Sequence, residues 1–125
     1  MASALILDQP RVGTDLDRVT DVLTEAFASV RAAVLDERPV VVLLEDGDLL
    51  GQGEVADAAL AAGLLGMTRA FALEGAKPGW RVNAVSHRGD EELAAAREAA
   101  AWLAGSTLSG QLVRAGTEHL GRVWP

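Results

Sequence analysis

The stretch PVVVLL, residues 39–44, is apolar at every position and contains three consecutive valines. Proline at its start and the polar segment EDGD, residues 45–48, after its end mark the limits of a short strand. A strand that is apolar on both faces is buried on both, as in a parallel sheet that helices cover on either side. This stretch therefore predicts an α/β fold in which a short parallel sheet is flanked by helices.

Strand and helix patterns alternate along the rest of the chain. Apolar residues recur at helical spacing from Leu16 to Leu35, and Thr14 is expected to cap this helix, with Asp17 completing a capping box. The expected elements are a strand at Ala4–Leu7, a helix at Leu16–Leu35, the central strand, a helix at Val55–Leu73, a strand at Arg81–Val85, a helix at Glu91–Ala104 and a strand at Gln111–Val113. This order predicts a single domain, residues 1–125, built as a three-layer sandwich with right-handed crossovers.

Composition and charge exclude several classes of function. The chain has 125 residues, no cysteine and a net charge of −7, from 18 acidic and 11 basic residues. An acidic surface repels phosphates, so nucleic acid and anionic membrane are not expected partners. Residues 1–10 lack the pattern of a signal peptide, and the longest apolar stretch, Ala58–Met67, is shorter than the about 20 residues of a membrane span. The lack of cysteine fits a reducing compartment, so we expect a cytoplasmic protein.

The helix expected at Val55–Leu73 is apolar on nearly all sides between Ala58 and Met67. One sheet covers only one face of a helix, so the opposite face must pack against something else. Alanine and glycine in this segment allow another helix to approach closely. The pattern favours an interface with another chain over complete burial within this one.

The segment AGLLGMTRAFALEGAKPGWRVNAV, residues 62–85, resembles the short-chain dehydrogenase/reductase family. In that family the helix matched by GMTRAFALE carries the catalytic tyrosine and lysine, and RVNAV matches the strand that follows. The resemblance extends from Thr14 to Gly116. It implies a partial Rossmann-like fold, because the family's first half, with the glycine-rich turn that binds dinucleotide phosphates, has no counterpart in this sequence.

The family's catalytic positions carry other residues here. The tyrosine and lysine of the Tyr-x-x-x-Lys motif fall at Asp57 and Ala61, and the chain contains no tyrosine. The catalytic serine falls at Leu44 or Glu45, and the structural asparagine falls at Val22. The resemblance therefore implies a degenerate member of the family with no catalytic residues and no cofactor site of its own.

The chemistry of the family explains why these replacements matter. Hydride transfer to a carbonyl needs a proton donor beside the carbonyl oxygen, which is the tyrosine hydroxyl assisted by the lysine cation. An aspartate side chain is ordinarily ionised at neutral pH and does not donate a proton, and Ala61 supplies no charge. Without a bound nicotinamide there is no hydride to transfer. We therefore expect a pseudoenzyme without oxidoreductase activity.

The resemblance also implies how the chain associates. In the family, the two long helices pair with the same helices of a second subunit as a four-helix bundle, and the segment matching Gln111–Val123 makes another subunit contact. The interface residues implied are Val19, Leu23, Phe27, Val30, Ala58, Ala62, Leu65, Met67, Arg69 and Phe71. The leading hypothesis is a hetero-oligomer with a complete short-chain dehydrogenase that binds NAD(P). The alternatives are a homodimeric scaffold or small-molecule-binding protein without redox activity and, third, an enzyme of unrelated activity.

Two other polar groupings have ordinary structural explanations. Ser86, His87 and Asp90 could suggest a hydrolytic triad, but we expect a loop followed by a helix cap. The acidic run at residues 45–48 does not complete a calcium-binding loop and is expected to be a solvated turn. His87 and His119 have no evident partners for a metal site, so no metal is expected.

Overall fold

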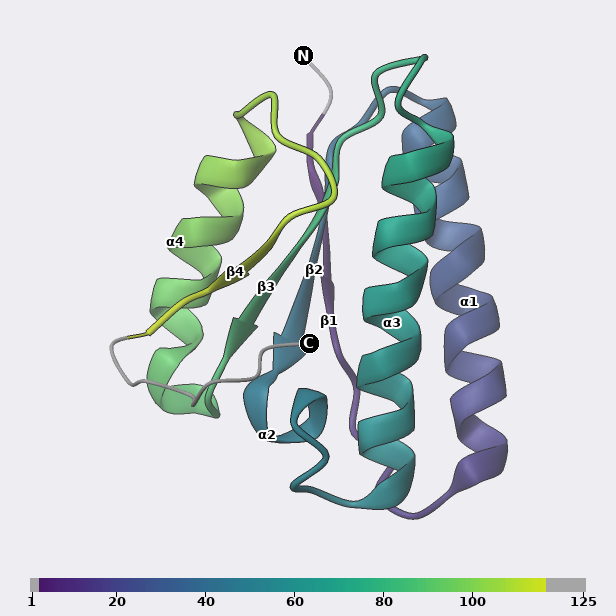
Figure 1. Cartoon of the computed structure of the whole chain (residues 1–125), viewed down its shortest axis with the longest axis vertical. Helices are drawn as coiled ribbons and strands as arrows, with labels where there is room; N and C mark the ends of the chain where they lie inside the picture. The colour runs from purple at the N-terminus through teal and green to yellow at the C-terminus, as the bar shows by residue number, and fades with distance from the viewer. Residues whose placement is uncertain (1–2, 117–125) are drawn as a thin grey trace.

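The computed structural model describes residues 3–116 and contains one four-stranded parallel sheet with the strand order β1-β2-β3-β4 (Figure 1). The strands are β1 (Leu5–Asp8), β2 (Val40–Glu45), β3 (Val82–His87) and β4 (Leu112–Arg114). Each strand pairs with the next one along the chain, and every connection crosses over through helical structure. The parallel sheet predicted from residues 39–44 is therefore confirmed.

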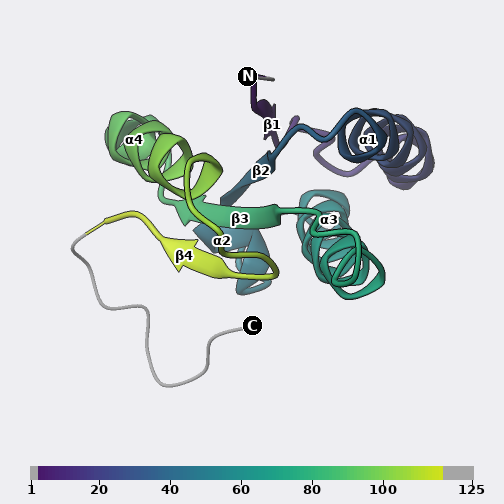
Figure 2. The same ribbon diagram turned by 90° about the horizontal axis from the view of Figure 1, so that it is seen from above.

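Helices cover both faces of this sheet. They are α1 (Leu16–Leu35), α2 (Asp46–Leu49), α3 (Val55–Glu74) and α4 (Leu93–Ala104), with a 3₁₀ turn η1 (Asp90–Glu92) before α4. Figure 2 shows α1 and α3 on one side of the sheet and α4 on the other. The three-layer, Rossmann-like α/β architecture predicted from the sequence is confirmed.

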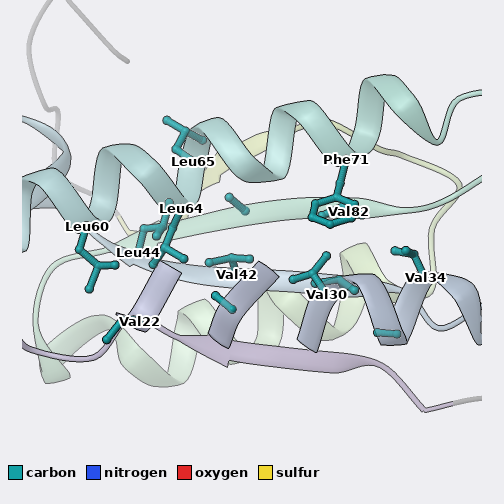
Figure 3. Close-up of a cluster of buried hydrophobic side chains, with 14 of the residues drawn as sticks. Val22, Val30, Val34, Val42, Leu44, Leu60, Leu64, Leu65, Phe71 and Val82 are labelled. Carbon is teal, nitrogen blue, oxygen red and sulfur yellow. The ribbon is translucent and has the colours of Figure 1, made fainter. Parts of the chain in front are cut away.

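The two faces of β2 build two separate hydrophobic clusters. Val40, Val42 and Leu44 point toward α1 and α3, where they meet side chains such as Val30 and Leu60 (Figure 3). The alternate residues of β2 join the cluster under α4, which Ala96, Ala100 and Leu103 complete. Because successive side chains of a strand point to opposite faces, a strand buried on both faces needs both helical layers.

The acidic segment after β2 does not form the solvated turn expected from the sequence. It forms the single helical turn α2, in which the side chains of Asp46 and Asp48 are buried, with exposed fractions of 0% and 3%. Burial is possible because arginines from distant parts of the chain neutralise these carboxylates: Arg114 lies 2.9 Å from Asp46, and Arg11 lies 2.6 Å from Asp48.

Two helix starts and the end of β3 also differ from expectation. Asp15, rather than Thr14, caps α1, because its Oδ1 accepts hydrogen bonds from the backbone N–H groups of Asp17 and Arg18. Ser86 and His87 lie in β3 rather than in a loop, because they pair with the last two residues of β2. The chain leaves the sheet after them and makes η1 before α4 begins.

Helix α3 is the core helix on its side of the sheet. Its 20 residues, with a mean hydropathy of 1.3 over the most apolar window, satisfy the length and composition of a membrane-spanning helix, so the sequence estimate from Ala58–Met67 alone was too short. In the structure, however, Leu60, Leu64 and Phe71 of α3 pack on the sheet, as the core helix of a globular domain does.

Two glycines of α3 face different surroundings, and this gives a test of the α1–α3 contact. A Cβ at Gly66 would meet no atom within 4 Å, whereas a Cβ at Gly63 would lie 2.9 Å from Cδ1 of Leu23 on α1. We expect Gly66→Ala to stabilise the fold by about 0.5–1 kcal/mol because alanine favours the helix. Gly63→Ala should gain less or lose stability, because Leu23 must shift.

Urea unfolding of both variants followed by circular dichroism measures this difference. Equal stabilisation by the two substitutions would contradict the close α1–α3 packing at Gly63.

Candidate functional site

Polar side chains gather where the strands of the sheet end. We call the residues Gln9, Arg11, Glu45, Asp48 and Asp57 the carboxyl-end cluster. Gln9 follows β1, Glu45 ends β2, and Asp57 lies in the first turn of α3. In open α/β sheets this edge is where ligands bind, so it is the first place to look for chemistry.

Asp57 uses its carboxylate to hold the loop after β1. Its Oδ1 accepts hydrogen bonds from the backbone N–H groups of Val12 (2.7 Å) and Gly13 (3.1 Å). Its Oδ2 lies 3.3 Å from a guanidinium nitrogen of Arg11, and the side chain is 2% exposed. The Asp57 carboxylate, which the resemblance placed at the family's tyrosine position, therefore serves as an internal acceptor.

Gln9 links the ends of β1 and β2 to α2. Its Nε2 donates to Oδ2 of Asp48 (2.8 Å), and its Oε1 accepts from the backbone N–H of Glu45 (3.0 Å). Arg11 donates to the same Asp48 oxygen at 2.6 Å. Burial lowers the pKa of the Arg11 guanidinium, but attraction to the carboxylates of Asp48, Asp57 and Glu45 outweighs the effect of burial. The pKa of Arg11 is therefore raised.

Glu45 and His87 lie side by side at the ends of β2 and β3. Oε1 of Glu45 accepts from the backbone N–H of Gly89 (2.7 Å), and its Oε2 lies 3.9 Å from Nδ1 of His87. The same Nδ1 lies 2.9 Å from the carbonyl oxygen of Gly89. These contacts fold the Arg88-Gly89 corner back onto the sheet, and Ser86 does not join them as a triad member, because its neighbours in the sheet are Leu44 and Arg114.

A second, partly buried group of charges joins β4 to α2 and η1. One guanidinium nitrogen of Arg114 lies 2.9 Å from Asp46 and 3.0 Å from Glu92. Glu92 also accepts from the backbone N–H of Arg88 (2.7 Å). Burial raises the pKa of the Glu92 carboxyl, but the hydrogen bonds from Arg88 and Arg114 outweigh it and hold this pKa below its usual value of 4.5.

The other residues that the resemblance placed at family positions belong to the core. Val22, Leu44 and Ala61 are buried, and Val22 and Leu44 lie in the cluster that α1, α3 and the sheet share. Ala61 is one turn after Asp57 on α3 and has no exposed surface. Among residues 3–116 no group of three or more histidine, cysteine or carboxylate side chains is placed to hold a metal ion, and His119 lies outside the described residues.

The outer face of α3 is uncovered in the part of the chain that the structure describes. A stripe of exposed residues with alternating spacings of four and three runs along the helix, and we call it the α3 stripe. Its members are Val55, Ala59, Ala62, Gly66, Arg69 and Leu73. Val55 and Leu73 are 70% and 78% exposed. This spacing is that of the seam along which two helices pack in a coiled coil.

The interface residues predicted from the resemblance divide into three groups. Val30, Leu65 and Phe71 are buried in the chain's own core. Four more are half-buried between α1 and α3 or at their edges: Val19, Leu23, Ala58 and Met67. Phe27, Ala62 and Arg69 are exposed on the outer face. The first group therefore belongs to the chain's own core. Sequence reasoning missed other exposed residues of the α3 stripe, among them Ala59 and Gly66, which could have been found from their heptad spacing. Most of the predicted Gln111–Val123 contact lies outside the described residues.

An apolar hollow of about 610 Å³ opens between the carboxyl-terminal halves of α1 and α3. Phe27, Met67, Phe71 and Trp80 line it, with Phe27 and Phe71 in ring contact at 5.2 Å between centroids. Because Phe27 is 51% exposed, an aromatic ring projects into solvent at the rim of this hollow. Exposed aromatic and aliphatic groups beside a concave surface are typical of binding sites.

Comparison with known proteins supports the fold. No protein-family model and no curated protein matches the chain. Among solved structures, the chain is similar to 3-hydroxyacyl-CoA dehydrogenase type-2 from Mycobacterium avium, with a TM-score of 0.55 and 24% sequence identity. The likeness covers 79% of this chain and 51% of the dehydrogenase, so the chain spans about half the length of that protein. The chain therefore has a Rossmann-like fold that resembles part of that dehydrogenase structure.

The hydrogen bonds of Asp57 predict a structural role for its carboxylate. We expect Asp57→Ala to destabilise the fold by about 2–4 kcal/mol, because two backbone N–H groups lose their acceptor. Asp57→Asn retains an acceptor oxygen and should cost less. Urea unfolding measures both, with the exposed Asp21→Ala as the control. A loss no larger than that of the control would show that the loop does not depend on Asp57.

The lowered pKa of Glu92 predicts a pH dependence of stability. A carboxylate whose pKa is lower in the folded state stabilises the fold above its unfolded value, near 4.5, and this stabilisation is lost as pH falls through the folded pKa. The difference in unfolding free energy between the native protein and Glu92→Gln should therefore shrink from about pH 6 to about pH 3. Glu91→Gln, which removes an exposed neighbouring carboxylate, controls for net charge. A constant difference for Glu92→Gln would contradict the assignment.

Proposed function

We propose that this chain is a non-catalytic, cytoplasmic partner subunit of a complete short-chain dehydrogenase/reductase, which it binds through the outer faces of α1 and α3. The complete dehydrogenase, and not this chain, binds NAD(P) and performs the reaction. The observation that carries the proposal is the uncovered α3 stripe, which exposes apolar groups along the whole length of a core helix.

The α3 stripe is suited to receive another helix. Ala59, Ala62 and Gly66 leave little side-chain bulk along its middle, so a second helix axis can approach at the short end of the usual 8–10 Å range. Val55 and Leu73 supply larger apolar groups at its two ends. Burying both side chains removes from water an apolar surface that is unfavourable on an isolated domain.

Helix α1 extends this surface. Phe27 and Leu35 are 51% and 57% exposed on α1 and border the apolar hollow beside α3. Arg31 and Glu74 also line the hollow, so a basic and an acidic group stand beside its apolar floor. An apolar centre with charged groups at its rim is the usual composition of a specific protein interface.

The surroundings of Asp57 and Ala61, which the resemblance places at the catalytic tyrosine and lysine, support a non-catalytic role. The Asp57 carboxylate is committed to Val12, Gly13 and Arg11, and Ala61 is fully buried beside it. A proton donor has to face a substrate carbonyl and be free to give up its proton. The groups at these two positions meet neither requirement, while the surface through which subunits associate keeps its apolar character.

The apolar hollow favours one alternative: a homodimer that binds a small apolar molecule without redox chemistry. Its volume of about 610 Å³ and its lining by Phe27, Met67, Phe71 and Trp80 are within the range of small-molecule sites. Under this alternative the α3 stripe pairs with its own copy.

Co-expression with a full-length short-chain dehydrogenase encoded beside this chain tests the proposal. Size-exclusion chromatography with mass determination should show one stoichiometric complex. Gly66→Glu should weaken the complex at least about tenfold, because it buries an unpaired carboxylate at the centre of the stripe. Gly66→Ala is the matched control: it adds one methyl group and no charge, meets no atom of its own chain, and should weaken the complex far less than Gly66→Glu does.

The other outcomes separate the alternatives. The isolated chain could instead form a homodimer that does not bind the reductase and that dissociates in Gly66→Glu. This result would favour the homodimeric binding protein. If the chain stays monomeric with and without the reductase, and Gly66→Glu changes nothing, both the partner-subunit and the homodimer hypotheses are contradicted.

A further inference from the structure

A polar hollow of about 240 Å³ lies at the carboxyl end of the sheet, on the side that α4 covers. Its walls come from the ends of β1, β2 and β3, from η1 and from the first half of α4. Leu43 and Leu93 give it apolar surface, and the ring of His87 borders it. At about 30 Å³ for each water-sized group, the hollow has room for about eight non-hydrogen atoms. It is therefore of a size for a small organic molecule.

The imidazole of His87 offers this hollow a hydrogen-bond acceptor. Its Nδ1 lies 2.9 Å from the carbonyl oxygen of Gly89, and a carbonyl oxygen only accepts, so Nδ1 carries the ring proton. In the neutral ring Nε2 then holds a lone pair. The ring turns Nδ1 toward Gly89, which does not line the hollow, so Nε2 is the nitrogen that the hollow can reach. No side chain of residues 3–116 donates to Nε2, although only 9% of His87 is exposed. A ligand that fits here donates to Nε2.

Both guanidinium groups that line the hollow are already neutralised. Arg97 lies 3.0 Å from a carboxylate oxygen of Asp8. Arg11 lies 2.6 Å from Asp48 and 3.3 Å from Asp57. An anionic ligand would have to compete with these carboxylates, so the two arginines do not by themselves favour an anion.

Two further carboxylates, those of Glu45 and Asp90, line the hollow beside His87. With the three carboxylates that hold the arginines, five carboxylates stand around the hollow against two guanidinium groups. This excess of negative charge attracts a cation.

An organic cation fits this group better than a metal ion does. Among residues 3–116, no three or more histidine, cysteine or carboxylate side chains are placed to hold a metal. An ammonium needs no fixed set of ligands, because its N–H groups donate to whatever acceptors surround it.

From these groups we infer that the hollow binds a small primary amine in its protonated form. The ammonium donates to Nε2 of His87 and is attracted by the carboxylates of Glu45 and Asp90. A short hydrocarbon chain packs on Leu43 and Leu93. This inference is independent of the proposed function, which uses the outer faces of α1 and α3.

Three small molecules of similar size and different charge test the inference in the full chain: n-butylamine, n-butanol and butyrate. Nitrogen–proton correlation NMR at neutral pH should show saturable shifts of the amides of Gly89 and Leu93 with n-butylamine. This amine should bind at least about tenfold more tightly than n-butanol, because its hydrogen bonds are charge-assisted. Butyrate should not bind, because the surrounding carboxylates repel it.

A pair of charge-neutralising variants separates a specific site from general attraction to an acidic chain. Asp90→Asn removes a carboxylate that lines the hollow and should weaken n-butylamine binding at least about threefold. Glu91→Gln removes the same charge from an exposed neighbour that does not line the hollow, and it is the matched control that should leave the affinity nearly unchanged.

The variant His87→Phe tests the acceptor itself. It keeps a ring of similar size and removes both nitrogens, so the preference for n-butylamine over n-butanol should fall at least about threefold. Circular dichroism checks that this variant folds. If it does not fold, the comparison of Asp90→Asn with Glu91→Gln still decides the question.

An alkylammonium group can belong to a free amine or to a lysine side chain of another protein, and Nα-acetyllysine amide distinguishes the two sources. Binding at least as tight as that of n-butylamine indicates a lysine side chain, and weaker binding indicates a free amine. Both results support an ammonium site.

Three results overturn the inference. The first is the absence of saturable shifts at Gly89 and Leu93 with n-butylamine. The second is equal affinity for n-butylamine and n-butanol. The third is an equal loss of affinity in Asp90→Asn and Glu91→Gln, because the amine would then respond only to the net charge of the chain.

Discussion

Every side chain of β2 from Val40 to Leu44 is buried, so this strand must be covered on both faces. That requirement places α1 and α3 on one side and α4 on the other, and it fixes the parallel neighbours that supply the backbone hydrogen bonds. A strand apolar on both faces also carries no side chain for chemistry within the sheet. The polar side chains of β2 therefore begin only at its carboxyl end, with Glu45.

At those ends, carboxylates serve the fold. Asp57 holds the loop after β1, Asp48 anchors Gln9 and Arg11, and Asp46 pairs with Arg114 from the last strand. Each pairs with a cation or a backbone donor, as burial of a charge requires. These contacts stabilise the positions of α2, the loop after β1 and the last strand relative to the ends of the sheet.

The part of the domain that the structure describes leaves the outer face of α3 open. Because one sheet covers only one face of a helix, the α3 stripe stays exposed among these residues. This surface suits a second helix, because its residues are small and follow a heptad spacing.

The parallel sheet and the long helices could be predicted from the sequence, because a fully apolar strand and a helical periodicity are local patterns. The sequence also predicted the ends of α1 and α3 within a residue. The side of α3 that faces the sheet could not be predicted, because an all-apolar helix gives no periodic signal and tertiary packing selects the buried face. Leu65 and Phe71 are therefore core residues and not the interface residues that the sequence analysis expected. The burial of Asp46 and Asp48 likewise depended on Arg114 and Arg11, and no local pattern reveals that distant arginines will neutralise an acidic turn.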